Sequence, residues 1–172
     1  EHVPGVYFRY NPVYYITNTA KSLLCGIEDM DDDVIWLNGD VVFDEGVIES
    51  VLSADENVIA VNTSECGEEE VKYRCDSEGN VLEISKSVKD PAGEAVGINK
   101  LGRRWMSQFK EALRKCEDDD YFEKGLEYLI EQGVRIKAHD ISRFQCIEVD
   151  FEEDWQKVQA AFLPAADLSS RR

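Results

Sequence analysis

Apolar residues recur along this chain with two different spacings, and the two spacings alternate. Around residues 20–30 and 47–52 they return every three or four positions, as on one face of an α-helix. Residues 34–37 and 58–61 instead form short continuous apolar runs, which are typical of buried strands. Strands that alternate with helices predict an α/β fold with a mixed, mostly parallel sheet and helices on both of its faces.

The middle of the chain alternates apolar and polar positions. Residues 71–75 and 81–86 do so on either side of residues 76–80, a stretch rich in turn formers, which predicts an inserted antiparallel β-hairpin. In the next run, residues 95–99, Gly97 marks either a simple bulge or the close approach of another backbone or a ligand. The same spacings predict further strands at 6–10, 134–138 and 146–150, and helices at 105–116, 122–130 and 151–162.

Length and composition limit the fold and the partners. With 172 residues, 43% of them hydrophobic, the chain can build one substantial core, so we expect one domain over residues 1–163 and a flexible tail at 164–172. A net charge of −17 argues against a nucleic-acid partner, and no apolar run approaches the ~18 residues that span a membrane. The five scattered cysteines predict reduced thiols and a cytoplasmic location.

Two aspartates follow apolar strands that lie far apart in the sequence. Asp40 comes after the run 34–37 and the pair Asn38-Gly39, and Asp150 ends the run 146–150. Carboxylate oxygens are preferred ligands of Mg²⁺, so the pair suggests one metal site. Each motif has a structural alternative. Asn-Gly is a strong signal for a β-hairpin, here between 34–37 and 41–43, and Asp150 with Glu153 fits a capping box at a helix start.

Four segments occur in the order found in nucleotidyltransferases that activate phosphorylated small molecules. They are Asn18-Thr19-Ala20-Lys21-Ser22-Leu23, Leu37-Asn38-Gly39-Asp40, Gly93-Glu94-Ala95-Val96-Gly97-Ile98 and Ile147-Glu148-Val149-Asp150-Phe151-Glu152-Glu153-Asp154. The chain resembles the branch of that family that contains phosphocholine, inositol-phosphate and phosphonoalkyl cytidylyltransferases. The resemblance implies a partial Rossmann-like nucleotide-diphospho-sugar transferase fold. Members also carry an initial Gly-x-Gly-x-Arg loop around the nucleotide phosphates, and no such loop occurs here. Residues 1–163 would then be the C-terminal two-thirds of the domain, a truncated and inactive piece.

The resemblance also implies a reaction. An oxygen of the acceptor's phosphate attacks the α-phosphorus of a nucleoside triphosphate, with CTP favoured, and pyrophosphate leaves. Positioning and charge neutralisation lower the barrier without a covalent enzyme intermediate. Asp40 and Asp150 would hold Mg²⁺ against the α-phosphate.

Further residues take roles by the same resemblance. Lys86 would be the catalytic lysine directed at the acceptor's phosphate, and Glu94 and Glu123 would lie near the acceptor. The remaining substrate-binding candidates are Asn18, Ser22, Asn38, Gly39 and Gly97. The alternatives are an exposed lysine at a strand end, ordinary surface glutamates, and a helix cap formed by Asn18 and Ser22.

Other readings compete with the cytidylyltransferase. A sugar-1-phosphate nucleotidyltransferase using UTP or another nucleotide is one. A non-catalytic interaction domain whose open sheet edge pairs with a second copy, giving a homodimer, is another. A glycosyltransferase is a distant third, because it usually shows Asp-x-Asp where this chain has Asn38-Gly39-Asp40. Trp36, Trp105 and Trp155 could form a cage for a quaternary ammonium, but their apolar surroundings favour core packing.

Overall fold

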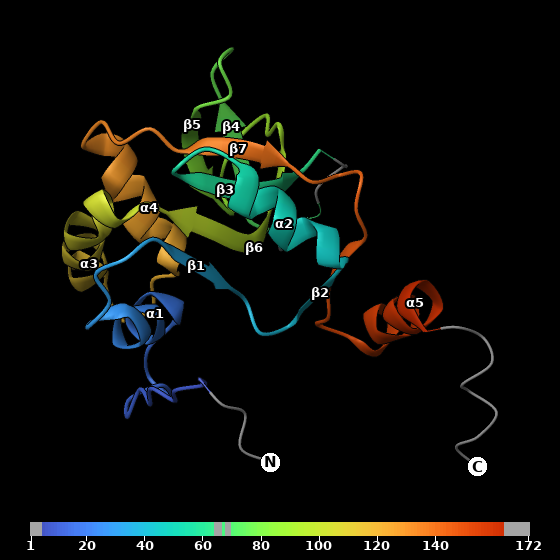
Figure 1. The fold of residues 1–172 in the computed structure, drawn as a ribbon, viewed down its shortest axis with the longest axis horizontal. Helices are drawn as coiled ribbons and strands as arrows, with labels where there is room; N and C mark the ends of the chain where they lie inside the picture. Colours follow the sequence, from blue (N-terminus) through green and yellow to red (C-terminus); the bar gives the residue numbers. More distant parts are fainter. Residues whose placement is uncertain (1–4, 64–66, 68–69, 164–172) are drawn as a thin grey trace.

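The computed structural model describes residues 5–63, 67 and 70–163 of the protein. Its main sheet is built around one long strand, β6 (Gly93–Leu101). The strands run in the order β5-β4-β6-β3-β7, and β1 also pairs with β6 (Figure 1). The other bounds are β1 Val34–Leu37, β3 Val58–Asn62, β4 Lys72–Cys75, β5 Val81–Ser85 and β7 Lys137–Asp140. Because β6 is nine residues long, one of its edges pairs with β4 at the start and with β1 at the end.

The directions of the strands refine the predicted sheet. The mixed α/β sheet is confirmed, and so is the inserted hairpin, which β4 and β5 form. Strands β1, β3 and β7 run in one direction, as expected for β-α-β units. Only β3 and β7 are parallel neighbours, however, because β6 runs in the opposite direction between β1 and β3. Most neighbouring pairs in the sheet are therefore antiparallel.

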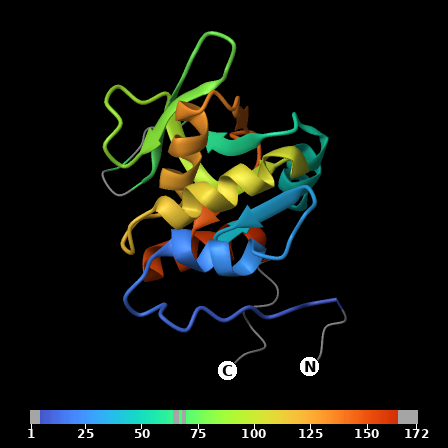
Figure 2. The same cartoon turned by 90° about the vertical axis from the view of Figure 1, so that its left-hand side faces the viewer.

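Helices cover both faces of this sheet, as predicted. Alternate residues of β3 point to opposite sides, so Ile59 and Val61 join one core cluster and Val58 and Ala60 join the other. The first cluster lies under three helices that gather together in Figures 1 and 2, namely α1 (Thr19–Ile27), α3 (Met106–Lys115) and α4 (Phe122–Glu131). The second lies under α2 (Glu45–Ser53). A 3₁₀ turn, Arg103–Trp105, precedes α3, and Gly133 follows α4 with a left-handed φ of 86°, as expected of a C′ glycine.

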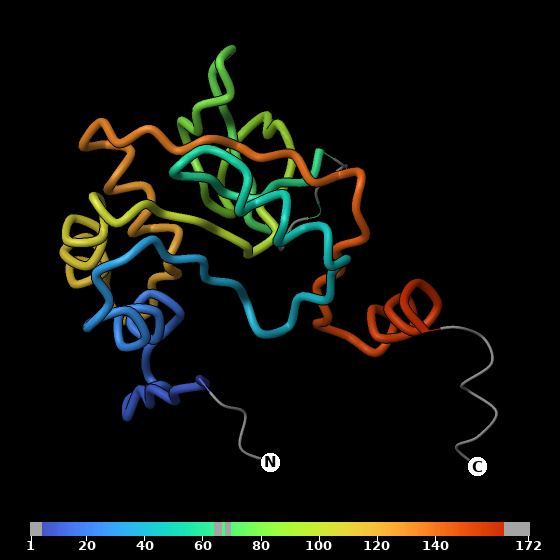
Figure 3. The backbone as a smooth tube through the Cα atoms, in the orientation of Figure 1, coloured from blue at the N-terminus to red at the C-terminus, as the bar shows by residue number. Residues whose placement is uncertain are grey.

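The tryptophans do not form a cage. Trp36 is buried and stacks on Phe109 with ring centres 5.1 Å apart, and Trp105 packs against the same core. Trp155 lies on α5 (Glu152–Phe162), which projects from the body in the tube view of Figure 3, and its side chain is 43% exposed. Its predicted place in a core stripe is wrong, because α5 buries only Val158.

One predicted strand and one alternative strand pairing are absent from the described residues. Residues 6–10 form no strand, because no other described strand lies beside them, and Tyr7, Phe8 and Tyr10 are exposed. The hairpin alternative for Asn38-Gly39 is also wrong. Strand β1 pairs with β6, whereas β2 (Val41–Phe43) pairs with β8 (Cys146–Glu148) in a separate small antiparallel sheet.

Three further predictions concern the C-terminal tail, the cysteines and membrane-spanning segments. The tail at 164–172 lies outside the described residues. Four cysteines are described, and all are free thiols. None of the described helices is both long enough and apolar enough to span a bilayer.

Candidate metal centre

The small sheet brings three carboxylates together. Asp40 directly precedes β2, Glu148 ends β8, and Asp150 follows two residues later. The pairing of Val41 with Glu148, and the Val149 N–H donating to the Asp40 carbonyl at 2.9 Å, hold the two segments side by side. One oxygen from each carboxylate lies within 4.8 Å of the others, and all three residues are exposed.

The structural alternative for Asp150 does not hold. Phe151, not Asp150, is the N-cap residue of α5. The carboxylate of Asp154 accepts the Phe151 N–H at 3.1 Å and so satisfies the start of the helix. The hairpin at Asn38-Gly39 is absent as well, so neither structural alternative explains the two aspartates. Instead, their carboxylates lie close together.

Sequence reasoning missed Glu148. The signal was present, since residues two apart in an extended strand point to the same side, which places Glu148 with Asp150. Partial burial raises the pKa of Glu148, and the charges of Asp40 and Asp150 raise it further, whereas the polar Asn38 side chain lowers it. Three hard oxygen donors with mutual repulsion suit Mg²⁺, which would relieve that repulsion.

Asn38, two residues before Asp40, lies against Gly97. The Asn38 N–H donates to the Gly97 carbonyl at 2.9 Å, and Gly97 has a left-handed φ of 72°. The register between β3 and β6 shifts near this glycine, so the predicted bulge is confirmed. A close approach occurs as well, but the approaching group is the Asn38 side chain and not the backbone or ligand that was predicted. Gly39 has open space around its α-carbon, and its role as a substrate contact stays a prediction.

Glu123 is buried, in contrast to the surface glutamate that was its alternative. It lies in the first turn of α4 and is 7% exposed, and its Oε2 has no hydrogen-bond partner among the described residues. Burial raises the pKa of Glu123 to about 7; the charge of Glu148 also raises it, and the charge of Lys86 lowers it. Glu123 is therefore close enough to both Glu148 and Lys86 for their charges to affect its pKa.

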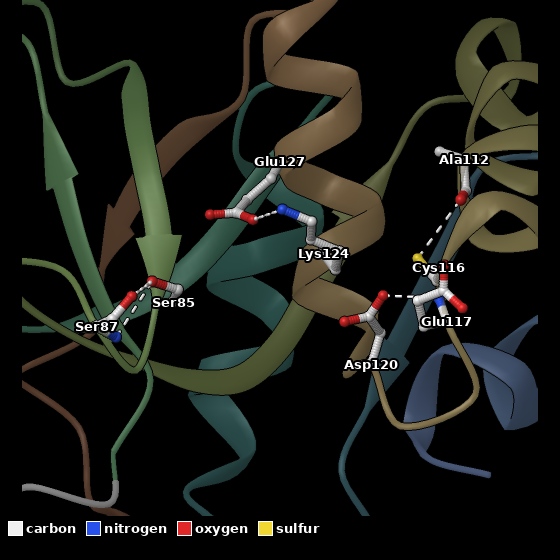
Figure 4. A network of polar contacts seen from close by, with 8 residues as sticks. All are labelled: Ser85, Ser87, Ala112, Cys116, Glu117, Asp120, Lys124 and Glu127. Carbon is white, nitrogen blue, oxygen red and sulfur yellow. Dashed lines mark hydrogen bonds and ion pairs between the residues drawn. The ribbon is translucent and has the colours of Figure 1, made fainter.

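Lys86 and the loop before α4 are held by local polar contacts. The Lys86 ammonium lies over the Tyr121 ring, 5.3 Å from its centre. Figure 4 shows the two turns involved. Ser85 and Ser87 interact on either side of Lys86, and the Asp120 carboxylate accepts the Glu117 N–H at 2.7 Å, shaping the loop that leads to Tyr121 and Glu123.

Glu94, Asn18 and Ser22 already have partners. The Glu94 carboxylate accepts from the Asn62 amide at 3.2 Å, and burial, followed by the charge of Glu70, raises its pKa. Asn18 is the N-cap of α1, as its alternative predicted, and Ser22 accepts from the Asn11 amide at 3.1 Å. Among the described residues, no hydrogen bond or ion pair joins Asn18 or Ser22 to the carboxylate cluster.

Nucleotidyltransferases of known structure share this fold. The CTP:phosphocholine cytidylyltransferase from Streptococcus pneumoniae matches with a TM-score of 0.72 at 15% identity, over 87% of this chain and 66% of that one. The inositol-1-phosphate CTP transferase from T. maritima matches with a TM-score of 0.68 at 17% identity, over 81% and 58% of the two chains. A nucleoside-diphosphate-sugar pyrophosphorylase from Vibrio cholerae RC9 gives 0.62 at 14%, over 81% and 64%.

At these identities the likeness establishes the fold that the resemblance predicted. No protein-family model matches the sequence, and no curated protein matches it either. The matched part of each of these three proteins is between 58% and 66% of its length. The activity of a whole nucleotidyltransferase is therefore a proposal for this chain.

Proposed function

We propose that the protein containing this chain is a Mg²⁺-dependent nucleotidyltransferase that transfers CMP from CTP to a phosphorylated or phosphonylated small molecule and releases pyrophosphate. One observation carries the proposal. Asp40 and Asp150, which the sequence suggested as metal ligands, lie with Glu148 in a cluster whose oxygens are within 4.8 Å. The fold is shared with solved cytidylyltransferases, which supports the choice of reaction.

The carboxylates suit a reaction in which charge must be neutralised. An acceptor oxygen attacks the α-phosphorus in line, a new P–O bond forms, and the bond to pyrophosphate breaks. Asp40, Glu148 and Asp150 would hold Mg²⁺, which when bound supplies positive charge against the α-phosphate. Without a cation, the same three side chains would repel a triphosphate.

Lys86 and Glu123 suit the acceptor. The Lys86 ammonium would bind the acceptor's phosphate and orient it for attack, with the Tyr121 ring as its support. The buried, unpartnered oxygen of Glu123 would accept a hydrogen bond from a hydroxyl or ammonium group of the acceptor. Glu94 and Gly39 remain candidate contacts, and Asn18 and Ser22 would have to exchange their present hydrogen bonds to join them.

Pyrophosphate release tests the proposal. CTP, Mg²⁺ and one of three acceptors (phosphocholine, inositol phosphate or 2-aminoethylphosphonate) would be supplied to this chain and to a version extended upstream. We expect the extended protein to release pyrophosphate, and its Asp40→Asn variant to release it at least a hundredfold more slowly. Absence of release from every CTP and acceptor pair would refute the cytidylyltransferase.

Two alternatives have an observation in their favour. The likeness to a nucleoside-diphosphate-sugar pyrophosphorylase supports a sugar-1-phosphate nucleotidyltransferase, which UTP and a hexose 1-phosphate would reveal in the same assay.

The second alternative is an interaction domain that forms a homodimer. In the part of the chain that the structure describes, β1 has a strand neighbour on one edge only, so a second copy could pair with the other. A molecular mass that rises with concentration in light scattering would support it.

A further inference from the structure

We propose that the aromatic segment of this chain, residues 6–16, pairs with the open edge of strand β1 in a second copy, so that two copies exchange their segments and form a dimer. The proposal names both surfaces of such a homodimer. It concerns the chain by itself and does not depend on the proposed enzymatic activity.

The aromatic segment exposes a large apolar surface. Tyr7, Phe8 and Tyr10 are 88%, 94% and 75% exposed, and five more apolar side chains of the segment are at least 40% exposed. Extended apolar patches are uncommon on monomers and mark interaction surfaces. Residues 6–10 consist largely of the aromatic and β-branched types that favour strands, yet no strand lies beside them in the described part of the chain. The segment therefore has the composition of a strand that lacks a partner.

Strand β1 has an open edge in the main sheet. Leu37 faces Ile98 of β6, and the next residue, Asn38, donates its N–H to the Gly97 carbonyl at 2.9 Å. Because hydrogen-bonded pairs alternate along an antiparallel ladder, the backbone groups of Ile35 and Leu37 point away from β6. No backbone hydrogen bond joins these groups to another described strand.

The two strands at the ends of the strand order β5-β4-β6-β3-β7 differ from β1. The Val81 N–H of β5 donates to the Ile136 carbonyl at 2.8 Å, and the Ala138 N–H of β7 donates to the Gly79 carbonyl at 3.0 Å. Both end strands thus use part of their outer edges. Within the described ranges, β1 is the strand of the main sheet whose outer edge makes no backbone hydrogen bond.

Charge favours the same pairing. The chain has 36 acidic residues, but residues 2–27 contain none, and Arg9 lies within the aromatic segment. Residues 28–33, directly before β1, are all acidic except one. Within one copy Arg9 already pairs with Asp29 at 2.6 Å, which shows that the two regions are complementary in charge. This complementarity would orient the segment on β1 despite the net charge of each copy.

The position of α1 separates the segment from β1 of its own copy. The segment lies on the side of α1 away from β1 in Figures 1 and 2. The Asn11 amide donates to the Ser22 hydroxyl at 3.1 Å, and the Asn18 N–H donates to the Asp118 carbonyl at 2.7 Å, which holds the segment and α1 in place. A second copy meets no such obstacle. Since each copy has one segment and one open edge, reciprocal exchange about a two-fold axis closes at a dimer.

Light scattering and sedimentation equilibrium of this chain test the proposal. We expect twice the monomer mass at high concentration. Phe8→Asp should weaken dimerisation at least about tenfold, because it places a charge in the paired segment, and it should spare the monomer, in which Phe8 is exposed. Leu52→Asp is the matched control. Leu52 is 59% exposed on α2, so its replacement should leave the dimer unchanged.

Two further measurements test the strand pairing itself. Leu37→Pro removes an outward N–H and leaves the bonds to β6, so it should abolish the dimer while the circular dichroism of the monomer is retained. A synthetic peptide of residues 6–16 in excess should compete with the exchanged segment and convert the parent dimer into monomers. A scrambled peptide of the same composition should not.

Three outcomes would overturn the proposal. The first is a parent chain that stays monomeric up to about 1 mM. The second is a dimer that Phe8→Asp and Leu52→Asp weaken equally or not at all, and the third is a dimer that the peptide does not compete with. Because no measurement uses CTP or a metal, these failures leave the proposed nucleotidyltransferase untouched, and absence of pyrophosphate release leaves the dimer untouched.

Discussion

The exposed carboxylate cluster and buried Glu123 show that carboxyl groups in different surroundings of one molecule differ in their electrostatics. Asp40, Glu148 and Asp150 are exposed and lie close together, so their negative charges repel one another and a divalent cation would relieve that repulsion. Glu123 is buried in the first turn of α4, and the loss of hydration on burial is the main cause that raises its pKa to about 7. The difference teaches that burial changes what a carboxylate of this acidic protein is suited to: the exposed cluster suits a metal ion, whereas the raised pKa of buried Glu123 favours its protonated form.

Removing one carboxylate of the cluster should have the largest effect. In the extended protein, Asp150→Asn keeps the shape of the side chain but loses the charge that would hold Mg²⁺. We expect the rate of pyrophosphate release to fall a hundred- to a thousandfold, as for other losses of transition-state charge stabilisation. Asp154→Asn is the control, because Asp154 caps α5 and does not belong to the carboxylate cluster, and it should lower the thermal stability more than the rate. Equal losses of rate in both variants would contradict the metal role of Asp150.

Replacing Glu123 tests the other side of the comparison. The folded protein binds the Glu123 proton more tightly than the unfolded chain, because its pKa of about 7 exceeds the ordinary 4.5. The stability that this proton contributes is complete below about pH 4.5 and is lost as the pH rises through about 7. Glu123→Gln should remove this dependence and be more stable than the parent at pH 8 by up to about 3 kcal/mol, with little difference near pH 4.5.

Urea unfolding of the parent and of Glu123→Gln at several pH values would measure this effect. Glu94→Gln is a useful comparison, since Glu94 is only partly buried and already accepts a hydrogen bond from Asn62. Its pH dependence should be the smaller of the two. Identical pH slopes for the parent and Glu123→Gln would show that Glu123 does not carry the proton.

Added Mg²⁺ should stabilise the parent chain through the cluster alone. At a concentration ten times its Kd, a ligand that binds only the folded state adds about 1.4 kcal/mol to the free energy of unfolding. We expect this gain at pH 8 in the parent and in Glu123→Gln, but not in Asp150→Asn. A gain that survives in Asp150→Asn would move the metal to another site.

The smallest expected effect concerns Tyr121. Its ring lies under the Lys86 ammonium, and an exposed cation–π contact is worth about 0.5–1 kcal/mol. Tyr121→Leu should raise the KM for the acceptor about two- to fivefold and leave the KM for CTP unchanged. Tyr121→Phe keeps the ring and should restore the parent value; failure to do so would assign the effect to the hydroxyl.

Local patterns predicted most elements of the fold. The helical spacing of apolar residues located α1 to α5 to within a few residues, because each helix except α5 buries a clear stripe. Pairing partners were harder to predict. Residues 6–10 alternate like a strand but have no described neighbour to pair with, and Asn38-Gly39 reads as a hairpin because the sequence does not reveal that β8 lies beside β2.

The candidate site, like the fold, was predictable where it depends on local sequence and not where it depends on pairing or packing between distant segments. Asp40 and Asp150 could be suggested because each follows an apolar strand, whereas Glu148 depended on a pairing between distant segments. The burial of Glu123 was not predictable from a polar residue at a helix start, because burial depends on tertiary packing between segments distant in the sequence. Gly97 was singled out for a close approach, but its sequence neighbours do not reveal that Asn38 is the approaching residue.

The position of Asp150 at the entrance to α5 has a mechanical consequence. A cation shared by Asp40 and Asp150 would fasten the start of β2 to the start of α5, two segments far apart in the sequence. It would add a cross-link between these segments to the three residue pairs that already join β2 and β8.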